Sequence, residues 1–96
     1  MIKNVLKESC YSINKAVNYL NCQKLVAIKT ETVYGVACNP ACIRSIKKLY
    51  ELKKRPVFNP LIIHVNSFEM AEKIAYVDKH SRLVMEKFWP GPLTLI

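Results

Sequence analysis

The prediction of the fold starts from one stretch of the sequence, Leu25-Val-Ala-Ile-Lys-Thr-Glu-Thr-Val-Tyr-Gly35. Its first four residues form a short apolar run between two lysines, which is typical of a buried strand. From Thr30 onward, β-branched and aromatic side chains suit an extended backbone, and the closing glycine permits unusual backbone angles. We therefore predict a buried strand over 25–28 and an extended segment over 30–35.

Helical patterns lie on both sides of this stretch. On the N-terminal side, residues 13–20 place apolar side chains at helical spacing, and Ser12 is the expected N-cap. On the C-terminal side, Asn39 is expected to cap a second helix that has Pro40 in its first turn. Pro56 should end this helix at about Lys54, because the residue before a proline is pushed out of the helical region.

The second half of the chain continues the alternation of strands and helices. Leu61-Ile-Ile-His-Val65 predicts a second buried strand. Ser67 and Asp78 are expected to cap two short helices, the second of which runs to about Phe88. Strands that alternate with helices predict an α/β fold in which helices flank a sheet.

The last residues combine a turn with an apolar run. Trp89-Pro-Gly-Pro92 predicts a stiff turn with Trp89 packed in the core. Leu93-Thr-Leu-Ile96 then predicts the beginning of a strand, which normally leads further into a sheet. We therefore expect residues 1–96 to form part of a single domain.

Composition narrows the class of protein. The chain has 96 residues, of which 51% are hydrophobic, and this excludes a wholly disordered basic tail. No stretch approaches the roughly 18 apolar residues of a membrane span, and charges interrupt the first eight residues, so we expect a cytoplasmic protein. The four cysteines lack the spacing of a zinc site, and we expect reduced thiols and no metal ligands.

Positive charge is concentrated in one segment. The chain carries 15 Lys and Arg residues against 7 Asp and Glu residues, a formal net charge of +8. Six of these cations lie between Arg44 and Arg55, where Glu51 is the one acidic residue. Such a cluster attracts polyanions, either a nucleic acid or the phosphates of a nucleotide. The alternative is a solvated helix face.

Two segments carry polar side chains that a purely structural role explains poorly. Residues 30–35 directly follow a buried strand, and open α/β sheets bind ligands where strands end. In the second segment, Lys53 offers a compact charge and Arg55 a planar fork for phosphate oxygens. Asn59 adds an amide that both donates and accepts hydrogen bonds. His64 lies within the second predicted strand, where a lone histidine is usually a core residue.

Three motifs, in this order, closely resemble the YrdC-like family, the L-threonylcarbamoyladenylate synthases. They are Thr30-Glu-Thr-Val-Tyr-Gly35, Lys53-x-Arg-Pro-x-x-Asn-Pro-Leu-x-x-His64 and Trp89-Pro-Gly-Pro-Leu-Thr94. The resemblance runs from about Leu25 to the last residue and covers the N-terminal half of the family's domain. It implies a YrdC-like twisted sheet with flanking helices around a positively charged cavity, apparently truncated.

The resemblance also implies a nucleotidyltransferase activity and its site residues. Family members use ATP, L-threonine and bicarbonate to make threonylcarbamoyl-AMP and pyrophosphate for tRNA modification. By resemblance, Thr32 and His64 would contact the threonine substrate. Lys53, Arg55 and Asn59 would bind ATP, and the two cations would also be catalytic because they stabilise charge on the phosphates. Mg²⁺ is implied by the nucleotide chemistry.

The sequence is compatible with several functions for a chain that covers part of the family's domain. Because the resemblance covers half a domain, we expect a fragment or a split subunit that a separate chain complements. A YrdC-like module that binds double-stranded RNA or tRNA without catalysis is an alternative, as is an inactive, decayed fragment. The motifs also resemble those of the YrdC-like domain in hydrogenase-maturation carbamoyltransferases, which forms a carbamoyl-adenylate, and this is a related enzyme alternative. Lys29 stands where the family usually has proline, and Lys54 stands where it usually has a small residue.

Overall fold

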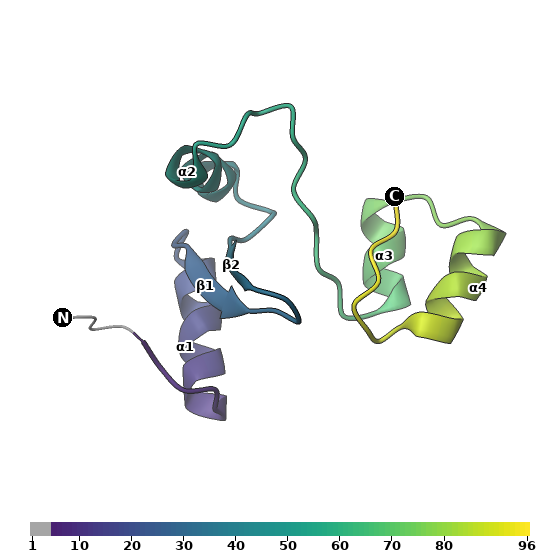
Figure 1. Ribbon diagram of the computed structural model, residues 1–96, viewed down its shortest axis with the longest axis horizontal. Coiled ribbons are helices and arrows are strands. Elements are labelled where there is room, and N and C mark those ends of the chain that lie inside the picture. Colours follow the sequence, from purple (N-terminus) through teal and green to yellow (C-terminus); the bar gives the residue numbers. More distant parts are fainter. Residues whose placement is uncertain (1–4) are drawn as a thin grey trace. The chain divides into compact units, whose positions relative to one another are not determined.

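The computed structural model describes residues 5–96, which form four helices and one two-stranded sheet (Figure 1). The elements in chain order are α1 (Cys10–Asn21), β1 (Val26–Lys29), β2 (Tyr34–Ala37), α2 (Ile43–Lys53), α3 (Phe68–Ile74) and α4 (Lys79–Phe88). The chain divides into two compact units, and the boundary falls between Asn59 and Pro60. Among the described residues, no helix has both the length and the apolar character that crossing a bilayer requires.

The sheet of the first unit is a hairpin. β1 and β2 pair antiparallel, with Val26 opposite Ala37 and Lys29 opposite Tyr34. The strand predicted over 25–28 is therefore confirmed within one residue at each end. The prediction of a continuous extended segment over 30–35 is wrong in its first part, because the chain turns at residues 30–33 before β2 begins.

Helix α1 begins one turn earlier than predicted. Ser9 is its N-cap, and its Oγ accepts a hydrogen bond from the N–H of Ser12 at 3.1 Å. The N–H of Ser9 in turn donates to Ser12 Oγ at 2.8 Å, which completes a capping box. Ser12 is thus the third helical residue and not the cap. Its small hydroxyl side chain serves either position, so the sequence pattern alone selected the wrong one.

Helix α2 begins later than predicted and ends as predicted. Its N-cap is Cys42, because Asn39 folds a turn before the helix. Asn39 Oδ1 accepts from the N–H of Ala41 at 2.9 Å, and the Asn39 carbonyl accepts from the N–H of Cys42 at 3.1 Å. At the other end the helix stops at Lys53, and Lys54 adopts the left-handed conformation with φ 49°.

Both predicted caps of the second unit are confirmed. Ser67 Oγ accepts from the N–H of Met70 at 3.1 Å at the start of α3. Asp78 Oδ1 accepts from the N–H of Ser81 at 2.7 Å at the start of α4, which ends at Phe88 as predicted. A polar side chain at the N-cap satisfies a backbone donor that has no partner within the helix, so local sequence places these ends well.

Aromatic and charged side chains join the elements of the second unit. Arg82 pairs with Glu72 at 2.6 Å between Nη1 and Oε1, which links α4 to α3. The Arg82 guanidinium also lies 5.5 Å from the ring centroid of Phe68. Phe68 stacks on Trp89 at 6.2 Å between centroids. Trp89 is half-buried, and its Nε1 donates to the Leu93 carbonyl at 3.0 Å, so the predicted turn at 89–92 packs back on itself.

The two other predicted strands are not formed in the described part of the chain. Residues 61–65 and 93–96 are not assigned to any strand. A strand needs a neighbouring backbone that exchanges N–H···O bonds, and the one sheet described consists of β1 and β2. The buried side chains expected over 61–65 are in part exposed, at Ile62 and Ile63. An apolar run predicts a strand only where a pairing partner exists.

Each unit buries few apolar side chains among the described residues. In the first unit Leu49 of α2 is buried, and in the second unit Ala71 of α3 and Met85 of α4 are buried. The apolar face predicted for the first helix is incompletely covered, because Ile13 and Val17 of α1 are exposed. Apolar area that stays in water contributes nothing to folding.

Candidate functional site

The segment that follows α2 bends sharply and returns toward the helix. We call residues 53–59 the basic turn. Pro56 cannot continue the helix, and the N–H of Arg55 donates to the Tyr50 carbonyl at 3.0 Å. The N–H of Asn59 then donates to the Pro56 carbonyl at 3.0 Å, which closes a β-turn over residues 56–59.

The carbonyl of Asn59 anchors this turn to α2. The hydroxyl of Tyr50 donates to it at 2.6 Å, and Arg55 Nε donates to the same oxygen at 3.4 Å. All three residues are half-buried. A carbonyl oxygen has two lone pairs, so both donors are accommodated. The contact of Nε at 3.4 Å also places the Arg55 guanidinium, the part of the side chain that recognises phosphate oxygens, beside the turn.

The residues predicted to bind ATP are therefore brought together by one short segment. Arg55 and Asn59 are in direct contact, and Lys53 is the last residue of α2. Lys53 is exposed, and a cation is favoured there because the C-terminal end of a helix carries partial negative charge. Sequence reasoning missed Tyr50 as the anchor, although it lies on the helix face that the apolar spacing identifies.

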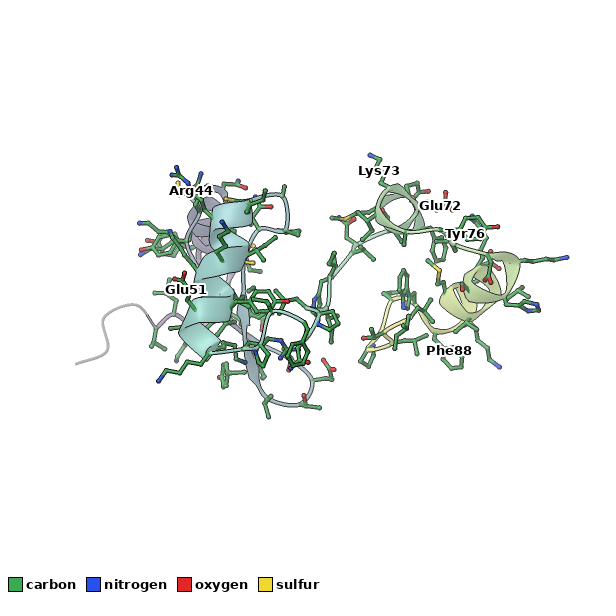
Figure 2. The ribbon with its side chains drawn as sticks, turned by 90° about the horizontal axis from the view of Figure 1, so that it is seen from above. Arg44, Glu51, Glu72, Lys73, Tyr76 and Phe88 are labelled. Atoms are coloured by element: carbon green, nitrogen blue, oxygen red, sulfur yellow. The ribbon has the colours of Figure 1, made fainter. Side chains whose placement is uncertain are left out.

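Further cations are exposed along α2. Arg44, Lys47 and Lys48 lie on the solvent side of the helix, and Figure 2 shows Arg44 and Glu51 toward opposite ends of it. Lys48 Nζ donates to the Gln23 carbonyl at 2.9 Å and so links α2 to the residues after α1. The positive segment predicted from the sequence thus forms one helix face and the turn that follows it.

The hairpin turn that contains Thr32 is organised by a different residue. Thr30 Oγ1 accepts from the N–H of Val33 at 3.2 Å and from the N–H of Thr32 at 3.4 Å, and the Thr30 hydroxyl donates to the Val33 carbonyl. Thr32 itself is exposed. A threonine whose hydroxyl binds backbone two or three residues on is a recognised turn signal, so Thr30 could have been identified from the sequence.

His64 belongs to the second unit, whereas Thr32 and the basic turn belong to the first. His64 is exposed and lies in the irregular segment before α3, so the interpretation of a buried core histidine is wrong. Joint contact of Thr32 and His64 with one substrate stays a prediction. The structure brings together the predicted ATP-binding residues and leaves these two in separate segments.

The chemistry of the cysteines is local. Cys42 occupies the N-cap position of α2 without a side-chain cap hydrogen bond, and the neighbouring polar groups of Ser45 lower the pKa of its thiol. Burial, together with the neighbouring Cys42, raises the pKa of the Cys38 thiol. All four cysteines are free. Within residues 5–96, no three His, Cys, Asp or Glu side chains lie together in a way that could hold a metal ion.

Comparison with known proteins gives consistent results. A family model named Sua5_yciO_yrdC and described as "Telomere recombination" matches residues 18–96. Threonylcarbamoyl-AMP synthase of Pyrococcus abyssi is 42% identical over 87 residues, which are 90% of this chain and 26% of that protein. The enzyme of the same name from Psychromonas ingrahamii is 38% identical over 95 residues, which are 96% of this chain and 49% of that protein.

A solved structure resembles the fold as well. The crystal structure of P. abyssi Sua5 complexed with L-threonine matches with a TM-score of 0.82 and 38% identity, over 90% of this chain and 26% of that one. The predicted α/β fold is thereby confirmed for the matched region. The chain spans between about a quarter and a half of the length of these relatives.

Proposed function

The chain belongs to the Sua5/YciO/YrdC family, and from this premise we propose that it supplies the ATP-binding part of a threonylcarbamoyl-AMP synthase. The reaction joins ATP, L-threonine and bicarbonate into threonylcarbamoyl-AMP and pyrophosphate. Relatives that carry this enzyme name support the proposal. The observation that carries it is the basic turn, in which Arg55 and Asn59 are held against α2 beside Lys53.

The proposed mechanism depends on charge stabilisation by the basic turn. The amine of threonine condenses with bicarbonate to give a carbamate and one molecule of water. A carbamate oxygen then attacks the α-phosphorus of ATP. The bond from that phosphorus to the β-phosphate oxygen breaks, and pyrophosphate leaves with the bonding electron pair. Negative charge accumulates on the phosphate oxygens during this step. Arg55, which the turn holds through its Nε, and the adjacent Lys53 would stabilise that charge, and no covalent enzyme intermediate is needed.

Threonine binding by Thr32 and His64 is part of the same proposal. The solved structure of P. abyssi Sua5, which is a complex with L-threonine, supports threonine as the ligand, and the two contact residues are assigned by the motifs that resemble the family. Magnesium would enter the site bound to the phosphates of ATP. Nucleotide-bound Mg²⁺ typically keeps several waters and needs few protein ligands.

Turnover is proposed to require the region that the relatives carry beyond the matched part. The chain corresponds to 49% of the P. ingrahamii protein and 26% of the P. abyssi protein. Large apolar side chains on the described surface support this requirement, among them Ile13, Val17, Ile43 and Leu52 in the first unit. A separate chain that supplied the remaining region could cover such surfaces.

Binding of double-stranded RNA or tRNA is a second candidate function. The exposed cations Arg44 and Lys47 on α2, together with the net charge of +8, favour it. Affinity that rests on phosphate contacts falls steeply with salt. RNA affinity that is the same at low and at moderate salt would reject this candidate.

The test of the main proposal is pyrophosphate release from ATP in the presence of threonine and bicarbonate. The chain is mixed with a polypeptide that carries the remaining region of a relative. Arg55→Ala should abolish release and weaken ATP binding by about 2–4 kcal/mol, because the complemented enzyme is expected to close the contact between Arg55 and a phosphate off from water. Lys79→Ala removes an exposed cation from the second unit and is the matched control. Equal activity of the two variants would contradict the proposal.

A further inference from the structure

The β-turn inside the basic turn presents two apolar side chains to solvent. Val57 and Phe58 occupy its central positions, and their exposed fractions are 85% and 81%. Turn centres usually carry Gly, Asn, Asp or Pro. An exposed phenylalanine forgoes the stabilisation that burial of its ring would contribute. Its position in a turn fixed by hydrogen bonds leaves the ring available for contact with a ligand.

The backbone of this turn is fixed before any ligand arrives. Phe58 precedes Asn59, whose N–H closes the turn and whose carbonyl accepts from Tyr50 and Arg55. Phe58 and Arg55 therefore lie three positions apart in one hydrogen-bonded turn, which limits how far the ring and the guanidinium can move relative to each other. An aromatic face and a phosphate-binding fork on one rigid turn match a ligand that has both a flat ring and phosphates.

We propose that Phe58 is a specificity residue that stacks on the adenine base of ATP while Arg55 and Lys53 contact the phosphates. This inference rests on the proposed function and deepens it, because it assigns the side chain that recognises the base. Val57 is similarly exposed but has no aromatic face, so it serves as the neighbouring control. Stacking of a base on an aromatic side chain changes affinity by about tenfold on alanine substitution.

The experiment compares ATP with inorganic tripolyphosphate, which has the phosphates and no base. Both are titrated calorimetrically into the full chain together with the complementing polypeptide. Phe58→Ala should weaken ATP binding by about tenfold and leave tripolyphosphate binding unchanged. Phe58→Tyr should retain ATP affinity, and Val57→Ala should alter neither titration. Phe58→Trp provides a second readout, because ATP should quench its fluorescence and tripolyphosphate should not.

The outcomes separate a failure of the stacking inference from a failure of the proposed function. Unchanged ATP affinity in Phe58→Ala overturns the stacking inference, as do equal losses for ATP and tripolyphosphate, which would indicate a damaged turn. Wild-type protein that binds tripolyphosphate as tightly as ATP also overturns it, but it leaves the phosphate site standing. Wild-type protein that binds neither overturns both the inference and the proposed function.

Discussion

Tyr50→Phe tests whether α2 holds the basic turn in its binding position. The substitution keeps the ring and deletes the 2.6 Å hydrogen bond from the Tyr50 hydroxyl to the Asn59 carbonyl. That carbonyl retains Arg55 Nε as a donor at 3.4 Å. The cost is therefore that of one net hydrogen bond, about 1 kcal/mol, and not the larger penalty of a buried carbonyl without a donor.

This cost should appear in two measurements. For a chain of 96 residues, about 1 kcal/mol lowers Tm by about 4–8 °C. If the turn must be ordered before ATP binds, the same free energy weakens ATP binding by about fivefold. Thermal unfolding followed by circular dichroism measures the first effect, and calorimetric titration measures the second. Tyr76→Phe is the matched control, because Tyr76 is 93% exposed and should change neither value.

Two results would refute this reasoning. An unchanged Tm in Tyr50→Phe would mean that the hydrogen bond contributes nothing in solution. A lowered Tm with unaltered ATP affinity would mean that the anchor stabilises the fold without positioning the turn for a ligand.

Three further substitutions probe other parts of the chain. Thr32→Val should weaken threonine binding and spare ATP binding in titrations of the complemented protein, since Thr30 holds the hairpin turn; equal losses would indicate a damaged fold. Hydrogen bonds from Ser81 lower the pKa of Asp78 in the folded chain. The ionised Asp78 therefore stabilises α4 fully above the ordinary pKa of an aspartate, and this stabilisation is lost as the pH falls through the lowered pKa. Thermal melts of Asp78→Asn from pH 7 to pH 3 should therefore show less loss than those of wild type, and identical curves would count against the cap. Gly91→Ala places a Cβ 2.7 Å from the Phe88 carbonyl oxygen and should cost roughly 1–3 kcal/mol in urea unfolding; an unchanged midpoint would show that the turn relaxes freely.

Features set by neighbouring residues could be predicted from the sequence. Ser67 and Asp78 cap their helices as expected, and the helix before Pro56 ends where the proline requires. The strand at 25–28 also forms. In each case the physical cause lies within a few residues of the feature, so the local pattern contains the information.

Features that depend on distant partners could not be predicted. Residues 61–65 have the composition of a strand and do not pair with another strand in the described structure. Within the site, the proximity of Arg55 and Asn59 follows from their spacing, but the Tyr50 hydroxyl that fixes them depends on how the turn folds back. The sequence pattern selected Ser12 as the cap of the first helix, and the structure places Ser9 there, because both residues are serine and either side chain can cap a helix.

The left-handed backbone of Lys54 has a consequence for the chemistry of the turn. Lys54 has φ 49°. Glycine adopts this conformation without steric strain, whereas a residue with a Cβ is destabilised there by roughly 1 kcal/mol. Lys54 therefore carries some backbone strain and adds a third cationic group between Lys53 and Arg55. A glycine at this position would remove the backbone strain at the end of α2 and would weaken the electrostatic attraction of the basic turn for anions.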